Sequence, residues 1–185
     1  MVEVLPRARA ETERLILRAF RNDDFEAYRD LFGDPSTLRY SERGPLTPEE
    51  AWTRLLRQIG HWSTLGYGMF AVEEKASGRL VGEVGLGDFR RQLGARFDPA
   101  PEAAWTIAGW ARSRGYAAEA ALGALSWIES RLRTDRTVCL IHAGNRASLK
   151  VAAKLGYAAF GRLRYRGYPA LLFERIGPAH PVAAG

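Results

Sequence analysis

The sequence predicts a mixed α/β fold, in which a mostly antiparallel central sheet of about seven strands is flanked by about four helices. Two observations predict this class. In the first half, a strand-like run and two helical patterns precede a pair of strand-like runs joined by a short turn. From residue 102 onward, strand and helix patterns alternate twice and end in two further strands, an order typical of a sheet of mixed direction.

The first elements are set by apolar runs and helix caps. Residues 14–20 predict a strand, and Asn22-Asp23-Asp24 then provide a cap and acidic first-turn residues for a helix. The second helix begins at Thr47-Pro48-Glu49-Glu50, which combines a cap, a proline at the first helical position and an acid at the third. This helix should end at Gly66 or Gly68.

Residues 69–74 and 79–89 predict an antiparallel hairpin with a turn at residues 76–78. Three glycines in its second strand resemble the start of a dinucleotide-binding motif, but no helix follows and Arg90 replaces the final glycine. We therefore exclude that site, because glycines inside a strand more often mark a bulge or a close backbone approach. The glycines are Gly82, Gly85 and Gly87. Residues 90–101 predict a loop that borders a substrate site.

The second half has two strand–helix repeats and a final pair of strands. The predicted strands are residues 103–108, 137–141, 158–166 and 170–176, and the predicted helices are residues 117–132 and the segment from Asn145 to 154–157. We expect one domain over residues 1–185, with a folded core at about 11–177 and mobile tails.

Composition limits the possible functions. At 185 residues and 46% hydrophobic content the chain can fill one core, and its apolar runs are far shorter than the roughly 20 residues of a membrane span. Without a signal-peptide pattern, it is expected to be soluble and cytoplasmic. The lone Cys139 permits no intrachain disulfide, and no metal-ligand cluster is recognisable. The net charge of +6 comes from scattered arginines, which makes nucleic acid an unlikely ligand and suits a polyanionic cofactor.

The segment Arg112-Ser113-Arg114-Gly115-Tyr116-Ala117 lies between a predicted strand and a predicted helix. Amide groups gather at a helix start, and such a place binds phosphate. An ordinary strand-to-helix turn also needs a glycine, but the two arginines add the positive charge that a pyrophosphate requires.

This segment matches the pyrophosphate loop of the GNAT superfamily of N-acetyltransferases, which the chain resembles. Further segments resemble the branch that contains the ribosomal-protein N-terminal acetyltransferases, although Ala104-Trp105 replaces a usual glycine and tyrosine and Ser113 a common glycine. These segments are Glu102 to Ile107, Gly115 to Ala120, Asn145 to Ser148 and Lys154 to Tyr157. The resemblance implies splayed central strands and acetyl-CoA as the co-substrate.

The resemblance also implies which residues hold acetyl-CoA. The backbone of the strand before the loop would pair with the pantetheine arm. The implied contacts are Trp105, Thr106 and Ile107 on the strand and Arg112, Ser113, Arg114, Gly115, Tyr116 and Ala117 in the loop.

Asn145 is expected to cap the following helix and also to hold the pantetheine chain or the thioester region. Ser148, or a water beside it, is the candidate acid for the departing thiolate, because Ala152 stands where many relatives have a tyrosine. Arg146 and Lys150 share a helical face near Asn145 and could meet the CoA phosphates, although such a row is often only a solvated face.

The acceptor amine must attack in its neutral form, which requires a base. Glu102 opens the strand that precedes the loop, on the same face as Ala104, and is the first candidate. Glu83 is the second candidate. Glu119, one turn into the cofactor helix, is expected to brace that helix.

The predicted function is direct acetyl transfer from acetyl-CoA to a primary amine, with a protein or peptide N-terminus as the expected acceptor. A small-molecule amine is the enzyme alternative, and an acyl-CoA-binding regulator is the non-enzyme alternative. Arginines near residues 36–46 and 90–101 favour an acceptor with some anionic character. Cys139 is a poor nucleophile for a covalent route. A monomer and a homodimer are both compatible with the sequence.

Overall fold

The computed structural model describes residues 8–40, 44–98, 100–132 and 134–177, and its elements follow the predicted order. In chain order they are β1 (Arg9–Glu11), β2 (Leu15–Ala19), η1 (Asn22–Asp24), α1 (Phe25–Gly33), α2 (Pro48–Leu65), β3 (Met69–Glu74), β4 (Leu80–Gly87), β5 (Glu102–Ile107), η2 (Gly109–Ala111), α3 (Tyr116–Leu132), β6 (Arg136–His142), α4 (Arg146–Lys154), β7 (Ala158–Tyr165) and β8 (Tyr168–Ile176).

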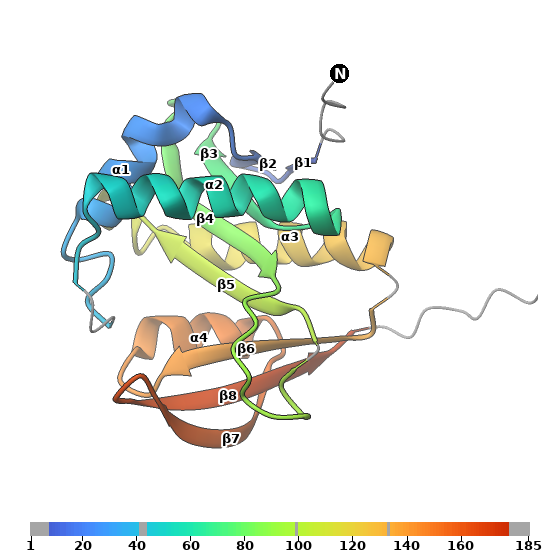
Figure 1. Ribbon diagram of the computed structural model, residues 1–185. Helices are drawn as coiled ribbons and strands as arrows, with labels where there is room; N and C mark the ends of the chain where they lie inside the picture. The colour runs from blue at the N-terminus through green and yellow to red at the C-terminus, as the bar shows by residue number, and fades with distance from the viewer. Residues whose placement is uncertain (1–7, 41–43, 99, 133, 178–185) are drawn as a thin grey trace, which may run out of the picture.

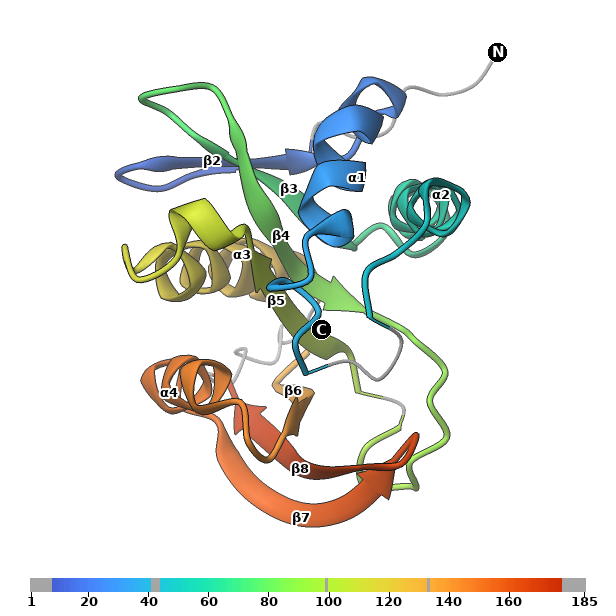
Figure 2. The same ribbon diagram turned by 90° about the vertical axis from the view of Figure 1, so that its left-hand side faces the viewer.

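Within the described ranges, eight strands form one mixed sheet in the order β1-β2-β3-β4-β5-β6-β8-β7 (Figure 1). Neighbouring strands are antiparallel except β5 and β6, which are parallel. The helices α1 and α2 lie on one side of the sheet and α3 and α4 on the other (Figure 2). The predicted fold class is therefore confirmed, with one strand more than expected.

The additional strand is β1, which pairs with β2 through Arg9 and Glu11. Ala8, just before it, is only 4% exposed. The expectation that the first ten residues are mobile is therefore wrong from residue 8 onward, while residues 1–7 and 178–185 lie outside the described part of the chain. Three residues are too few to show the alternating pattern by which a strand is recognised in a sequence.

The central strands β5 and β6 separate along most of their length. They share a single backbone register pair, Glu102 with Val138, whereas β6 pairs along its whole length with β8. Figure 1 shows β6 turning away from β5 as β5 continues toward the start of α3. The splay that the family resemblance implied is therefore present.

Local sequence explains the ends of α2 well. Thr47 accepts a hydrogen bond from the Glu50 amide at 3.2 Å, and the Glu50 carboxylate accepts one from the Thr47 amide at 2.9 Å. This is a complete capping box. The helix ends at Gly66, whose φ of +72° is a conformation that glycine adopts without strain.

Glycines in β4 allow other backbone segments to approach closely. A Cβ atom on Gly82 would lie 2.2 Å from the Thr106 carbonyl oxygen, and one on Gly85 would lie 2.4 Å from the Gly68 carbonyl oxygen. Since β4 continues through these glycines as a strand, the exclusion of a dinucleotide site agrees with the structure.

Apolar side chains pack on both faces of the sheet. Tyr28, Phe32 and Leu55 are buried under α1 and α2, and Ala120 and Ile128 attach α3 to the opposite face. None of the helices within the described ranges is long and apolar enough to span a membrane.

Candidate active site

A cavity of about 660 Å³, called here the cofactor groove, opens where β5 and β6 separate. Trp105, Thr106 and Ile107 of β5 contribute to its wall, as predicted. On this side, β5 forms no strand pair beyond Glu102 with any residue that the structure describes. An extended ligand could therefore pair with the free backbone groups of β5.

One end of the cofactor groove is formed by the predicted phosphate loop. Ser113 and Gly115 both have positive φ angles, +62° and +84°, and these turn the chain sharply into α3. Ala117, in the first turn of α3, lines the groove beside them. The first amides of a helix have no partner within the helix, so they are available to an anion at this point. Arg112 is held in place by donating from Nε to the Ile107 carbonyl at 3.1 Å.

Arg114 belongs to the predicted loop, but its side chain does not line the groove. Its guanidinium pairs with Glu74 at 3.2 Å, and Arg14 donates to its carbonyl at 2.9 Å. Tyr116 donates its hydroxyl to the same Glu74 carboxylate at 2.5 Å. The side chains of Arg114 and Tyr116 therefore anchor the loop to β3, and Tyr116 also lines the groove at the start of α3.

The opposite wall of the groove comes from α4. The Asn145 carboxamide oxygen accepts a hydrogen bond from the Ser148 amide at 3.1 Å, so Asn145 is the predicted helix cap. Arg146 and Lys150 both line the groove, as does Lys154 one turn further on. Five cations line the groove in total, and no acidic residue does so among the described residues. They are Arg39, Arg112, Arg146, Lys150 and Lys154.

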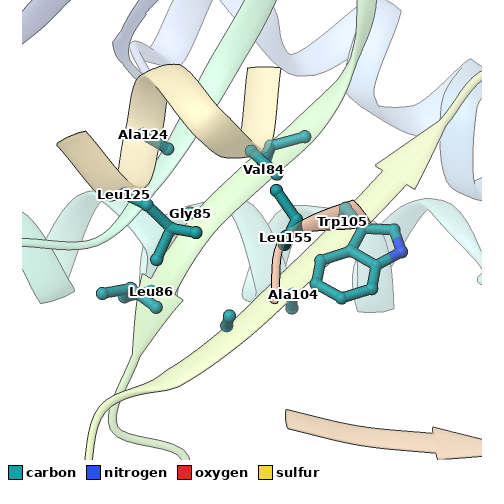
Figure 3. A pocket seen from close by; sticks show the side chains of 10 residues that line it. Val84, Gly85, Leu86, Ala104, Trp105, Ala124, Leu125 and Leu155 are labelled. Carbon is teal, nitrogen blue, oxygen red and sulfur yellow. The ribbon is translucent and has the colours of Figure 1, made fainter. Parts of the chain in front are cut away.

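Trp105 and Ser148 meet across the gap between β5 and α4. The indole Nε1 donates to the Ser148 hydroxyl oxygen at 3.2 Å. The hydroxyl proton of Ser148 remains free to be donated to another group. On the far side of the indole lies a small apolar hollow, shown in Figure 3.

Glu102 lies at the other face of the sheet and lines a second cavity of about 470 Å³, called here the loop cavity, together with described residues of the segment between Gly87 and Ala100. The Glu102 residue is 4% exposed, and Arg91 donates from Nε to its carboxylate at 2.5 Å. Burial raises the pKa of Glu102 above its usual range, although the Arg91 guanidinium opposes the rise. Arg91 is itself positioned by the Tyr165 hydroxyl oxygen at 2.7 Å.

Glu83, the second candidate base, and Glu119, the expected helix brace, do not line either cavity. Glu83 is fully buried and receives hydrogen bonds from Tyr28 at 2.6 Å and Arg54 at 2.5 Å. Glu119 braces α3, as expected, by accepting from Thr12 at 2.6 Å and from Arg14 at 2.8 Å. Partial burial would raise the pKa of Glu119, but these hydrogen bonds outweigh it and lower the pKa below its usual range.

Comparison with known proteins assigns the chain to a family. The family model for the acetyltransferase (GNAT) domain matches residues 14–158. The chain belongs to the GNAT acetyltransferase family.

Individual relatives agree with this assignment. A Bordetella pertussis protein assigned to the GnaT family superposes with a TM-score of 0.81 at 32% identity, covering 91% of this chain and 99% of that one. The uncharacterized Bacillus subtilis protein YkkB is 26% identical over 89% of this chain and 93% of its own length. The ribosomal-protein-S5-alanine acetyltransferase of Vibrio fischeri shares the fold, with a TM-score of 0.71 at 18% identity over 92% of this chain and 97% of that one.

GNAT acetyltransferases use acetyl-CoA as their co-substrate, and the cofactor groove suits this molecule. The five cations and the α3 amides match a phosphate-rich end, while the open edge of β5 matches an extended amide-containing arm. The residues that would hold acetyl-CoA are therefore those of the groove, without the Arg114 side chain.

Several residues of this GNAT site were not identified from the sequence. Arg39 and Tyr40 reach the groove from the segment that follows α1, which has no periodic pattern. Lys154 continues the four-residue spacing of Arg146 and Lys150 on the same helical face, but only those two residues were expected to meet the CoA phosphates. Arg91 was counted only as a loop charge, and nothing local indicates that it pairs with Glu102.

The surroundings of Cys139 and His142 indicate that both side chains have structural roles. Cys139 is 1% exposed, and burial raises the pKa of its thiol, so the thiolate needed for covalent catalysis is disfavoured. The His142 Nδ1 accepts from the Gly144 amide at 2.9 Å, and its ring stacks on Tyr168 with centroids 5.2 Å apart.

Proposed function

We propose that this GNAT enzyme transfers the acetyl group of acetyl-CoA directly to a primary amine, and that the amine is a protein or peptide N-terminus. One observation carries the proposal. Glu102, a buried carboxylate, stands on the loop-cavity side of β5 at the point where β5 and β6 still pair, while the cationic cofactor groove opens further along the same strand. A base and a cofactor site thus approach the gap from opposite faces.

Glu102 is proposed as the base that removes a proton from the attacking amine. A carboxylate with a raised pKa accepts a proton more readily near neutral pH. An α-amino group has a pKa of about 8, whereas a lysine amine near 10.4 needs roughly 3–4 kcal/mol for the same deprotonation. A single modest base therefore suits an N-terminal amine better than a lysine side chain.

Ser148 is proposed as the acid that protonates the departing thiolate. Because Trp105 donates to the Ser148 oxygen, the serine hydroxyl is oriented with its own proton free. The activated thioester supplies the acyl carbon. The new bond is N–C, the broken bond is C–S, the amine proton passes to Glu102, and the Ser148 proton passes to sulfur; solvent water then takes the proton from Glu102 and returns one to Ser148.

The loop cavity supports an extended, chain-like acceptor that enters from its open side. Phe89 and Phe97 provide apolar walls, and much of the described part of the loop between β4 and β5 lines the cavity. The fold shared with the Vibrio fischeri ribosomal-protein acetyltransferase is consistent with a protein acceptor. The anionic preference inferred from loop arginines has little support, since Arg90 and Arg91 pair with Asp88 and Glu102.

The test uses purified protein, acetyl-CoA and matched acceptors. One peptide is prepared with a free and with a formylated N-terminus and contains one internal lysine; polyamines, amino sugars and amine antibiotics complete the panel. Release of CoA thiol and an acetyl mass gain on the free N-terminus alone is the expected result. Acetylation of only a small amine, or of the internal lysine, would refute the acceptor and keep the transferase. Binding of acetyl-CoA without any turnover would favour the regulator.

A further inference from the structure

A small apolar hollow of about 10 Å³ lies between the β4–β5 part of the sheet and α3. Leu86 and Ala103 of the strands, Leu125 of α3 and Leu155 after α4 form its walls, and no polar side chain lines it within the described chain. A volume of this size is about that of a single water probe, and an apolar wall offers such a water no hydrogen bond. The hollow is suited to hydrocarbon.

Trp105 separates this hollow from the cofactor groove. Among the residues that the structure describes, it is the one that lines both spaces. Figure 3 shows its ring at the rim of the hollow, near Leu155, with the ring nitrogen directed away from Leu125. That nitrogen reaches Ser148 on α4, so the indole spans from β5 to the helix that forms the opposite wall of the groove.

The Trp105 indole lies at the point along β5 where the acyl group of a bound thioester would arrive. The phosphate loop follows Ile107, and the strands close together at Glu102, so the groove leads from the loop toward Trp105. A ligand with phosphates at the loop and a thioester at its other end would bring the acyl group to this partition. The indole then limits how far a carbon chain can extend.

We propose that Trp105 is the residue that sets acyl-chain length, by closing the groove against the apolar hollow so that an acetyl group fits and longer chains do not. This inference rests on the proposed transfer function. The chemistry is unchanged for any acyl group, because the amine forms the N–C bond as the C–S bond breaks. Removal of the indole would join the hollow to the groove and admit a longer chain.

The experiment compares acetyl-, propionyl- and butyryl-CoA in the wild type, W105A and W105L. An apolar pocket discriminates one methylene by roughly 10–200-fold. We expect wild type to favour acetyl over butyryl in kcat/KM by at least about tenfold, and W105A to raise the butyryl-to-acetyl ratio by about tenfold or more. W105L, which fills more of the space, should give a smaller rise and supplies the result if W105A does not fold.

A second readout does not depend on turnover. The dissociation constants of acetyl-CoA and butyryl-CoA are measured calorimetrically without acceptor, and their ratio should shift toward butyryl-CoA in W105A. W52A is the matched control, because Trp52 lies on α2, is 38% exposed and packs on Phe25 away from the groove. Both ratios should stay at their wild-type values in W52A.

The outcomes separate the two claims. If wild type turns over butyryl-CoA as well as acetyl-CoA, or if both Trp105 variants leave the two ratios unchanged, Trp105 does not set chain length. If wild type transfers no acyl group to any amine, the proposed function fails, and the shift in binding ratio alone then decides whether the partition exists.

Discussion

Within the described part of the chain, the cationic side chains on one side of β5 are unpaired, whereas those on the other side form ion pairs. In the cofactor groove, five cations stand together and none forms an ion pair with a described acidic residue. On the opposite face, Arg90 pairs with Asp88 and Arg91 with Glu102. A surplus of charge suits a polyanion that arrives with its own negative groups, whereas paired charges hold a proton acceptor in position.

The largest effect is expected from E102Q. If Glu102 is the base, its loss should lower kcat by about 10²–10⁴-fold. In wild type, kcat/KM should fall on the acid side, and the raised pKa of Glu102 places this fall above the usual carboxylate range, because the base must be deprotonated to act. The measurement is a pH profile of both proteins, normalised to the folded fraction from circular dichroism.

E83Q is the matched control for this variant. Glu83 is equally buried and also pairs with an arginine, Arg54, but lies outside both cavities. Each glutamine leaves an arginine without its anion and should reduce stability. Only E102Q should lose the acid-side fall in rate; the same loss in E83Q would contradict the assignment.

The next effect is on acetyl-CoA affinity. Removing Arg146 and Lys150 together should weaken binding by about 2 kcal/mol, or roughly thirtyfold, because both side chains are exposed, line the groove and would face the phosphates of a bound cofactor. The weakening should shrink at high salt, which screens exposed charges. Isothermal titration at two salt concentrations measures this.

The R162A/R164A variant removes two exposed arginines from β7, away from the groove. It should leave both the affinity and its salt dependence near wild type. An equal loss in this variant would mean that overall charge, and not the unpaired cluster, attracts the cofactor.

A smaller effect is expected for a substitution of Glu119, a carboxylate that lines neither the cofactor groove nor the loop cavity. E119Q should reduce the free energy of unfolding by about 1.5 kcal/mol, since Glu119 accepts charge-assisted bonds from Arg14. The folded-state pKa of Glu119 is lowered, so this stability is present above its ordinary value of 4.5 and is lost as pH falls below it. Urea unfolding at neutral and acidic pH should show the difference between E119Q and wild type disappearing in acid.

The smallest effect is expected for S113G, in the phosphate loop. Ser113 has a φ of +62°, which costs an L-residue about 1–2 kcal/mol, so S113G should be neutral or stabilising by about 0.5 kcal/mol. G115A, at a φ of +84°, should instead destabilise by about 1–2 kcal/mol. Thermal unfolding checks both, and a destabilised S113G would show that the serine side chain has a role in the loop.

The sequence predicted the cofactor groove better than the loop cavity, for a physical reason. Helix starts and the Arg146–Lys150 face depend on residues within one or two turns, and these features are present in the structure. The pairing of Arg114 with Glu74 joins residues 40 positions apart, and the Arg91–Glu102 pair depends on how a loop folds back. Such contacts follow from tertiary packing, for which a single sequence carries no periodic signal.

The single backbone pair between β5 and β6 links binding to folding. A ligand that lies along the free edge of β5 completes the sheet and connects the β6–β8–β7 segment to the rest of the protein. At a free concentration of about 100 times Kd, such a ligand stabilises the folded state by about 2.7 kcal/mol. Amide hydrogens on both sides of the gap should then exchange more slowly. The supply of acetyl-CoA would therefore govern how long the protein stays folded as well as how fast it transfers acetyl groups.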